Sequence, residues 1–340
     1  MAEAAENVAV IGGGSWGTAL AQLAAEAGRD VLLWMRDEAK ADAVNTSHRN
    51  KTYWPKHRLS ENIRATADLA EAAGFARYML IALPSQCFRE VVGALGEHVG
   101  GDHVLVHGTK GLESGTCRRM SEILREETPV KRLGALSGPN LAAEIMEKNP
   151  AAAVVASRYP EVVFRTQAAL SSERFRVYGN RDIAGVELAG SLKNVMAIFA
   201  GIADGLGLGH NTLAMVMTRG AEEIRRFGVA MGAEDETFAG LSGIGDLIAT
   251  CSSEMSVNRQ VGFRLSRGEK LEDILKSLNR VAEGVRTTRT VLEMAGRKGV
   301  EMPIIWAVNA VLYEDADPAD INHMLMTRRS KYEKDRYYNK

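Results

Sequence analysis

The sequence predicts an α/β protein in which a doubly wound sheet at the N-terminal end is followed by an all-α C-terminal domain. In the first half of the chain, short apolar stretches alternate with helical patterns, which is typical of a parallel sheet covered by helices. After Tyr178 this alternation stops, and long helical periods punctuated by glycine continue to about Met326. We therefore expect one domain over residues 7–180 and a second over 181–326, with Asp182 as a helix cap near the boundary.

Bulk properties favour small-molecule partners. A chain of 340 residues with a net charge of −1 has room for two cores and no strong field to attract nucleic acid or an anionic membrane. Its three cysteines, Cys87, Cys117 and Cys251, lack metal-ligand spacing and fit a reduced, cytoplasmic protein without a metal. No signal-like region or membrane-spanning apolar run is apparent. For the basic tail, 327–340, a solvated segment is favoured over an interaction arm.

The first element is a strand, Val8–Ile11, that runs directly into the pattern G-x-G-x-x-G at Gly12, Gly14 and Gly17. The first glycine permits a tight turn, the second lets a pyrophosphate approach the backbone, and the third lets the next helix pack closely on the strand. A helical stretch over 18–27 and a second strand over 31–34 complete a βαβ unit. This Rossmann-type unit predicts a dinucleotide-binding domain, with a plain tight turn as the alternative.

Further buried strands are predicted downstream. They cover residues 78–83, 104–106, 133–136, 152–156 and 175–178. Loops 84–85, 107–111 and 137–140 follow three of them, and ligands of doubly wound sheets lie just outside the carboxyl ends of strands. These loops are therefore candidate walls of a site. The region 36–66 has no clear period and is predicted to be an irregular connection.

One helix of the second domain contains a lysine on a face of small residues. Its apolar stripe includes Leu188 and Leu192, whereas the adjoining face includes Ala189, Gly190 and Lys193. Small residues indicate that another segment passes close by, so Lys193 would be partly desolvated and its pKa lowered, which makes proton transfer feasible. The alternative is a surface lysine that extends to solvent.

Residues at three other places in the chain could contribute to chemistry. Asp246 lies in a Gly-Ile-Gly-Asp stretch and either faces a lysine or caps a helix. The group Ser256, Asn258 and Arg259 suits a phosphate, with capping and surface charge as the alternatives. Lys110 follows a strand end, where it either meets an anionic or carbonyl oxygen or lies in a surface loop.

Taken together, these residues resemble the bacterial-type NAD(P)-dependent sn-glycerol-3-phosphate dehydrogenases, from Val8 to about Pro303. The motifs in order are the glycine turn, Thr109-Lys110-Gly111-Leu112-Glu113, Ser137-Gly138-Pro139, Gly190-Ser191-Leu192-Lys193-Asn194, Thr218-Arg219-Gly220, Gly243-Ile244-Gly245-Asp246-Leu247 and Val281-Ala282-Glu283-Gly284. Each motif is weak alone, and the ordered set is specific.

The resemblance implies interconversion of dihydroxyacetone phosphate and sn-glycerol 3-phosphate with NADP or NAD, which would supply glycerophospholipid synthesis. It implies that Lys193 is the proton donor and acceptor, with Asp246 and Lys110 beside it in the catalytic group. The implied substrate contacts are Lys110, Gly138, Asn140, Lys193, Asp246, Ser256, Asn258 and, as a compensating cation, Arg259. The implied cofactor contacts are Gly12, Gly14, Ser15, Trp16, Gly17, Arg36, Lys110, Ala142, Val281 and Glu283. A homodimer is left open.

Cofactor preference depends on the end of the second strand. An acidic residue there usually binds a ribose 2′-OH, and an arginine accommodates a 2′-phosphate. The chain offers both, Arg36 and then Asp37. Arg36 comes first, and the resemblance implies that it meets the adenosine phosphate, so NADPH is favoured, with NADH as the alternative.

Two positions depart from the family pattern. Asn140 stands where the family usually has Thr or Ser, and an amide can still donate a hydrogen bond. Val257 stands where the family usually has Arg. If that arginine makes one charge-assisted bond to the ligand, its absence costs about 1.5–3 kcal/mol of binding free energy. Two alternatives therefore stay open: a related dehydrogenase acting on another small sugar phosphate or hydroxy acid, and a dinucleotide-binding sensor without activity.

Overall fold

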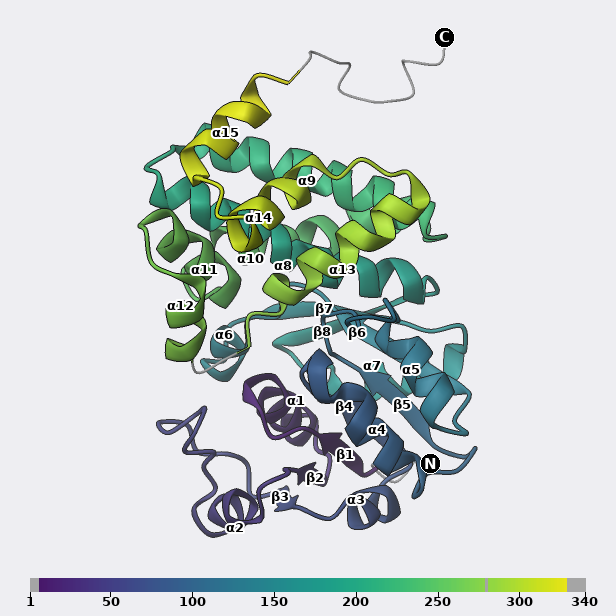
Figure 1. Cartoon of the computed structure of the whole chain (residues 1–340). Coiled ribbons are helices and arrows are strands. Elements are labelled where there is room, and N and C mark those ends of the chain that lie inside the picture. The colour runs from purple at the N-terminus through teal and green to yellow at the C-terminus, as the bar shows by residue number, and fades with distance from the viewer. Residues whose placement is uncertain (1–5, 279–280, 329–340) are drawn as a thin grey trace.

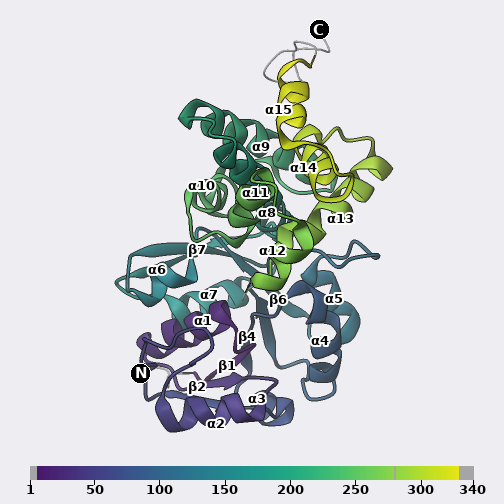
Figure 2. The ribbon, with the colours of Figure 1, turned by 60° about the vertical axis from the view of Figure 1, so that its left-hand side comes forward.

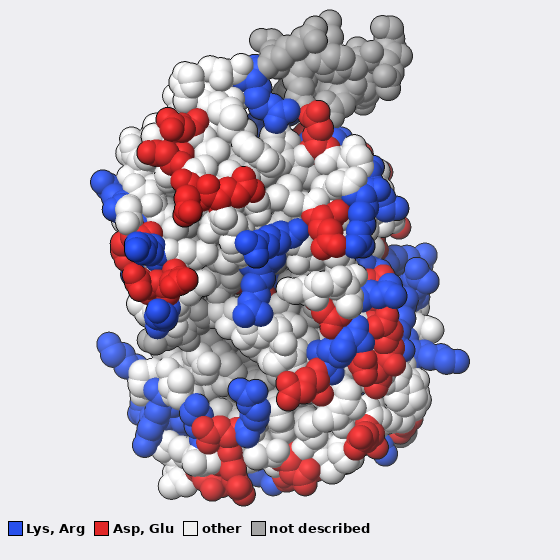
Figure 3. Space-filling view, viewed as in Figure 1, with Lys and Arg blue, Asp and Glu red and all other residues white. Residues whose placement is uncertain are grey.

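The computed structural model of the chain describes residues 6–278 and 281–328. A sheet half, residues 8–180, lies against a helical half, residues 183–326 (Figure 1). The predicted basic tail lies outside the described residues beyond Arg328. Acidic and basic side chains are interspersed on the face shown in Figure 3, in keeping with the balanced composition of the chain.

The sheet has eight strands in the order β3-β2-β1-β4-β5-β6-β7-β8, and the direction of winding reverses between β1 and β4. The strands are β1 (Val8–Ile11), β2 (Val31–Trp34), β3 (Ile63–Thr66), β4 (Tyr78–Ile81), β5 (Val104–His107), β6 (Arg132–Ser137), β7 (Ala151–Ala156) and β8 (Phe175–Asn180). The predicted doubly wound sheet is confirmed. The strands pair in parallel, as expected, except that β7 runs antiparallel to β6.

Helices cover both faces of the sheet (Figure 2). Along β1, Val8 and Val10 pack into the core beneath one helix group, and Ala9 and Ile11 pack beneath the other. The first group is α1 (Ser15–Glu26), α2 (Glu38–Ser47), α6 (Ala142–Met146) and α7 (Pro160–Leu170); the second is α3 (Leu69–Phe75), α4 (Phe88–Gly96) and α5 (Met120–Glu127). Strands with both faces buried read as continuous apolar runs, which explains why they were found from the sequence.

The region 36–66, predicted to be irregular, contains α2 and the edge strand β3. The helix is capped by the side chain of Asp37 and buries only Ala41 and Val44, so its apolar period is too sparse to detect. β3 has four residues, Ile-Arg-Ala-Thr, with Arg64 exposed. A short edge strand of mixed polarity is difficult to tell from a loop in a single sequence.

The helical half is built around α8 (Ile183–Gly205). The other α-helices of this half share one apolar core with α8. They are α9 (His210–Ala230), α10 (Asp246–Ser252), α11 (Val257–Ser266), α12 (Leu271–Ser277), α13 (Glu283–Lys298), α14 (Pro303–Tyr313) and α15 (Pro318–Met326). α8 is long and apolar enough to cross a membrane, with 23 residues and a mean hydropathy of 1.4. However, 94% of its most apolar window is buried inside the protein, which identifies it as a core helix.

α8 and α11 cross at close range. Gly262 of α11 faces the carbonyl oxygen of Ile198, and Gly201 of α8 faces the carbonyl oxygen of Arg259. A Cβ atom at either glycine would overlap the opposing backbone. Glycine at these two positions therefore sets the distance between α8 and the helix that begins at the pocket.

Replacing Gly262 with alanine is expected to lower the free energy of unfolding by about 1–3 kcal/mol, because the added methyl group forces the two backbones apart. The matched control is Gly296→Ala in α13, where a Cβ meets nothing within 4 Å. Gly296→Ala is expected to be neutral or to stabilise by up to about 1 kcal/mol through helix propensity. Urea denaturation measures both changes, and equal stability of the two variants would contradict the close crossing.

Candidate active site

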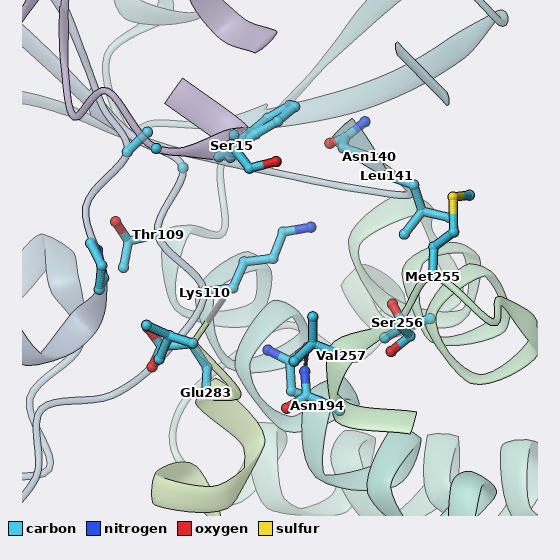
Figure 4. Close-up of a pocket in the computed structure, with 18 of the residues that line it drawn as sticks. Ser15, Thr109, Lys110, Asn140, Leu141, Asn194, Met255, Ser256, Val257 and Glu283 are labelled. Atoms are coloured by element: carbon cyan, nitrogen blue, oxygen red, sulfur yellow. Dashed lines mark hydrogen bonds between the residues drawn. The ribbon is translucent and has the colours of Figure 1, made fainter. Parts of the chain in front are cut away.

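A cavity of about 330 Å³ lies where the carboxyl ends of β1, β4, β5 and β6 meet the helical half. Figure 4 shows side chains converging on it from segments that are far apart in the sequence. Its lining residues are Gly14, Ser15, Trp16, Tyr53, Ala82, Leu83, Pro84, Gly108, Thr109, Lys110, Asn140, Leu141, Lys193, Asn194, Thr250, Met255, Ser256, Val257, Asn258, Val281 and Glu283. The strand-end loops predicted to form the walls of a site therefore do contribute to this pocket.

The glycine turn between β1 and α1 forms one end of the cavity. Gly12 has φ = +125°, which L side chains rarely adopt, and a Cβ at Gly17 would overlap the carbonyl oxygen of Gly12. A Cβ at Gly14 would meet nothing within 4 Å, so this residue borders open space. No side chain caps the N-terminus of α1. Its first N–H groups are therefore suitably placed for an anion.

Two polar atoms beside this turn suit a ligand. The hydroxyl of Ser15 and the indole nitrogen of Trp16 are buried, and neither has a hydrogen-bond partner within the described chain. Buried polar groups are usually paired, so these two point to a bound molecule or water at this end of the pocket. The turn, the uncapped helix and these side chains together fit a dinucleotide.

A buried ionic group occupies the centre of the site. Lys193, from α8, is only 5% exposed, and its Nζ donates to Oδ1 of Asp246 and, at 2.7 Å, to Oγ1 of Thr250. Lys110, from the loop after β5, donates to Oδ2 of Asp246 at 2.7 Å and to the carbonyl oxygen of Gly138 at 2.9 Å. One carboxylate thus lies between two ammonium groups that come from different halves of the molecule. A lysine extended to bulk solvent, the alternative for Lys193, is excluded.

Burial lowers the pKa of Lys193 to about 8. The carboxylate of Asp246 opposes this shift, whereas the nearby positive charge of Lys110 adds to it. An amine with a pKa close to neutrality can both donate and accept a proton under physiological conditions. The arrangement is therefore suited to proton transfer at the pocket surface.

A second ionic group holds α8 against the sheet. Glu187, on the turn of α8 before Gly190, accepts hydrogen bonds from the N–H and hydroxyl of Ser121 and from Arg119 at 2.6 Å. Burial raises the pKa of Glu187, but hydrogen bonding and the charges of His107 and Arg119 outweigh burial and hold it well below the usual range. The charged carboxylate therefore anchors the start of α8 to α5 and to the end of β5.

Amides and a helix start form the wall opposite the glycine turn. Ser256 caps α11 by accepting from the N–H of Arg259 and also lines the cavity, so capping does not prevent its hydroxyl from donating to a ligand. Asn258 donates from Nδ2 to Oδ1 of Asn194 at 3.1 Å, and both residues line the cavity. Val257 also lines it and contributes an apolar surface.

Several of the predicted site residues lie outside the cavity lining. Arg259 pairs with Asp204 at 2.9 Å, because its position on α11 directs it toward the end of α8. Arg36 is exposed just beyond β2, and Ala142 is the first residue of α6. Asp246 and Gly138 lie behind the lining residues, where both accept hydrogen bonds from Lys110. Among residues 6–278 and 281–328, no group of His, Cys, Asp or Glu could hold a metal ion.

The structure adds residues that the sequence patterns did not single out. Thr250 contacts Lys193 and lies one helical turn after Asp246, so the i, i+4 spacing on α10 was a usable signal. Asn194 appeared only as part of a motif. Ser85, whose hydroxyl and N–H both donate to Glu283, had no signal beyond its place after a strand.

Comparison with known proteins gives the family. Residues 7–163 match the N-terminal model of NAD-dependent glycerol-3-phosphate dehydrogenase, and residues 182–323 match the C-terminal model. The glycerol-3-phosphate dehydrogenase [NAD(P)+] of Syntrophotalea carbinolica is 45% identical over 97% of this chain and all of its own length. That of Thermobifida fusca is 44% identical over 96% of this chain and 98% of its own.

Solved structures agree. The glycerol-3-phosphate dehydrogenase of Coxiella burnetii superposes with a TM-score of 0.91 at 35% identity, covering 95% of this chain and 99% of that one. The enzyme of Saccharomyces cerevisiae superposes with a TM-score of 0.82 at 27% identity, covering 95% and 99%. The chain therefore belongs to the NAD-dependent glycerol-3-phosphate dehydrogenase family.

Proposed function

We propose that the chain interconverts dihydroxyacetone phosphate and sn-glycerol 3-phosphate with NAD(P)H, and that Lys193 transfers the proton. The observation that supports this most directly is a buried lysine with a pKa of about 8 in a pocket that extends to a dinucleotide-type glycine turn. During reduction, protonated Lys193 donates to the oxygen of the ketone as negative charge develops there. During oxidation, the neutral amine accepts the proton of the hydroxyl group.

Asp246 orients this proton donor. Its Oδ1 accepts from Lys193 and its Oδ2 from Lys110, so the carboxylate fixes the direction of both ammonium groups. Thr250 fixes a second side of the Lys193 nitrogen. Holding the amine at one place beside the reacting oxygen is a large part of what the protein contributes to the rate. Lys110 belongs to the catalytic group because it also contacts Asp246 and lies at the pocket surface.

The cofactor supplies the hydride when bound. The residues proposed to hold it are Gly12, Gly14, Ser15, Trp16, Gly17, Arg36, Lys110, Ala142, Val281 and Glu283. The open space beside Gly14 and the two unpaired polar atoms of Ser15 and Trp16 support this assignment. The residues proposed to hold substrate are Lys110, Gly138, Asn140, Lys193, Asp246, Ser256 and Asn258. Arg259 is left out, because it pairs with Asp204.

The wider role follows from the reaction. We propose a dinucleotide-binding domain over 7–180, a helical substrate domain over 181–326, and a cytoplasmic enzyme that supplies glycerol 3-phosphate for phospholipid synthesis. Because Val257 is apolar, a panel of small sugar phosphates and hydroxy acids is the direct test of substrate identity. Oxidation of NADPH or NADH, followed by absorbance, is expected with dihydroxyacetone phosphate. Turnover with another panel member alone would contradict the proposal.

Lys193→Met is expected to lower kcat by about a hundredfold to ten-thousandfold, because it removes the proton donor. Cofactor affinity, measured by fluorescence titration, is expected to stay near that of wild type. The control is Lys276→Met, at an exposed position of α12. Near-normal turnover by Lys193→Met would remove this residue from the mechanism.

The pH profile is expected to follow the same amine. Ketone reduction needs protonated Lys193, so kcat/KM should be level at low pH and fall as pH rises through about 8. Oxidation needs the neutral amine and should rise through the same region. Asp246→Asn removes the charge that raises the pKa of Lys193, so the midpoint should move to lower pH. An unchanged midpoint in Asp246→Asn would show that another group controls the profile.

Arg36→Ala is expected to lower kcat/KM for NADPH by about ten- to a hundredfold, as for the loss of one charge-assisted hydrogen bond to a 2′-phosphate. The value for NADH should change little. Arg297→Ala, an exposed residue near the end of α13, serves as the charge-matched control. Equal losses with both cofactors would mean that Arg36 does not recognise the 2′-phosphate.

A further inference from the structure

A hydrogen-bonded contact joins the two halves at the edge of the pocket. The N–H of Ser85, just after β4, donates to Oε1 of Glu283 at 2.9 Å, and the Ser85 hydroxyl donates to Oε2. Glu283 is the first residue of α13. Gly111 permits the contact, because a Cβ there would lie 2.9 Å from Cβ of Ser85 and 3.1 Å from Oε2 of Glu283. The side chain of Glu283 thus pins the start of α13 to the sheet half.

The next residue continues the connection toward the catalytic lysine. The N–H of Gly284 donates to Oδ1 of Asn258 at 2.9 Å, and Nδ2 of Asn258 donates to Oδ1 of Asn194 at 3.1 Å. Asn194 directly follows Lys193 in α8. A Cβ at Gly284 would lie 2.5 Å from the carbonyl oxygen of Asn194, so only glycine allows this approach. We call the series Ser85, Glu283, Gly284, Asn258 and Asn194 the amide relay.

The amide relay sets which way both amides point. Because an N–H group occupies Oδ1 of Asn258, its nitrogen must face Asn194, whose oxygen is then occupied in turn. Asn194 also approaches the carbonyl oxygen of Gly190 through Nδ2, at 3.5 Å. Each amide nitrogen has two hydrogens, so within the described chain one from each is left for an oxygen atom in the cavity that both residues line.

We propose that Ser85 and Glu283 are positioning residues for the substrate: their contact holds the first turn of α13 so that the Gly284 N–H orients the two amides toward the pocket. This inference rests on the proposed function. It gives Glu283 a task at the substrate side of the pocket, through hydrogen-bond acceptance by its side chain. A negative charge is not needed for that task.

The test compares Glu283→Ala with Glu283→Gln. Glu283→Ala is expected to raise KM for dihydroxyacetone phosphate at saturating NADPH by about three- to tenfold, as for one lost hydrogen bond. The Kd of sn-glycerol 3-phosphate, measured by calorimetry without cofactor, should rise by a similar factor. Glu283→Gln keeps an acceptor at the same distance and should recover most of this loss. A Gln variant as impaired as the Ala variant would overturn the proposal in favour of a charge effect.

Double variants distinguish the amide relay from a local effect of Glu283. Asn258→Ala already interrupts the route, so adding Glu283→Ala should raise KM for dihydroxyacetone phosphate by less than about twofold more. If wild type is active and the KM increases of the two single variants multiply in the double variant, the relay is overturned and the proposed function remains intact. Absence of dihydroxyacetone phosphate reduction by wild type would instead overturn the proposed function.

A milder variant covers the case in which Glu283→Ala does not fold. Ser85→Ala removes one of the two bonds to Glu283 and keeps the backbone donor, so a rise in KM for dihydroxyacetone phosphate of about two- to fivefold is expected. Ser252→Ala is the control, because that exposed hydroxyl bonds only to the carbonyl oxygen of Ile248 among described residues. Equal KM values for Ser85→Ala and Ser252→Ala would overturn the proposal.

Discussion

The site depends on one carboxylate that two lysines share. Asp246 is 1% exposed, and an unpaired charge so deeply buried would be costly, so it needs both Lys193 and Lys110. Lys110 comes from the sheet half, whereas Asp246 and Lys193 come from the helical half. The same interaction therefore satisfies a buried charge, joins the two halves at the pocket and orients the proton donor. Loss of either lysine would leave this buried carboxylate with one ammonium partner instead of two.

Close backbone approach brings these groups together. Gly190, one turn before Lys193 on α8, lies against the Ser137 hydroxyl at the end of β6, where a Cβ would come within 2.7 Å. Gly138 then has φ = +134°, which turns its carbonyl oxygen to Lys110. Glycine is favoured at position 138 by its positive φ and the nearby backbone of Ala152, whereas a Cβ at position 190 would require the Ser137 hydroxyl to move. The small residue at position 190 therefore lets α8 lie close to the side chains of Ser137 and Lys110 at the sheet edge.

The sequence predicted those parts of the molecule whose signal is local. The glycine turn, the apolar strands and the small face around Lys193 are each readable within a few neighbouring residues, and the structure agrees with them. The antiparallel direction of β7 was not predictable, because strand direction depends on where the chain crosses the sheet. The short apolar stretch Ala151–Ala156 predicts a buried strand but carries no information on its direction. Contacts between distant segments, such as Ser85 with Glu283 or Arg259 with Asp204, have no local pattern. Such pairings emerge only when the two halves are packed together.

Charge balance explains why oriented dipoles matter in this pocket. Lys110 and Lys193 are opposed by Asp246, and the acidic side chain of Glu283 also lines the pocket, so these groups leave at most about one positive charge, whereas a phosphate monoester carries roughly −1.5 to −2 near neutral pH. Among the described lining residues the cationic side chains are Lys110 and Lys193, and Val257 adds none. The remaining negative charge must be met by N–H groups, which the amides of Asn194 and Asn258 and the start of α11 beside Ser256 can supply. Donors of this kind stabilise an anion only when their direction is fixed in advance, and a chain of hydrogen bonds from the sheet to α8 provides that direction.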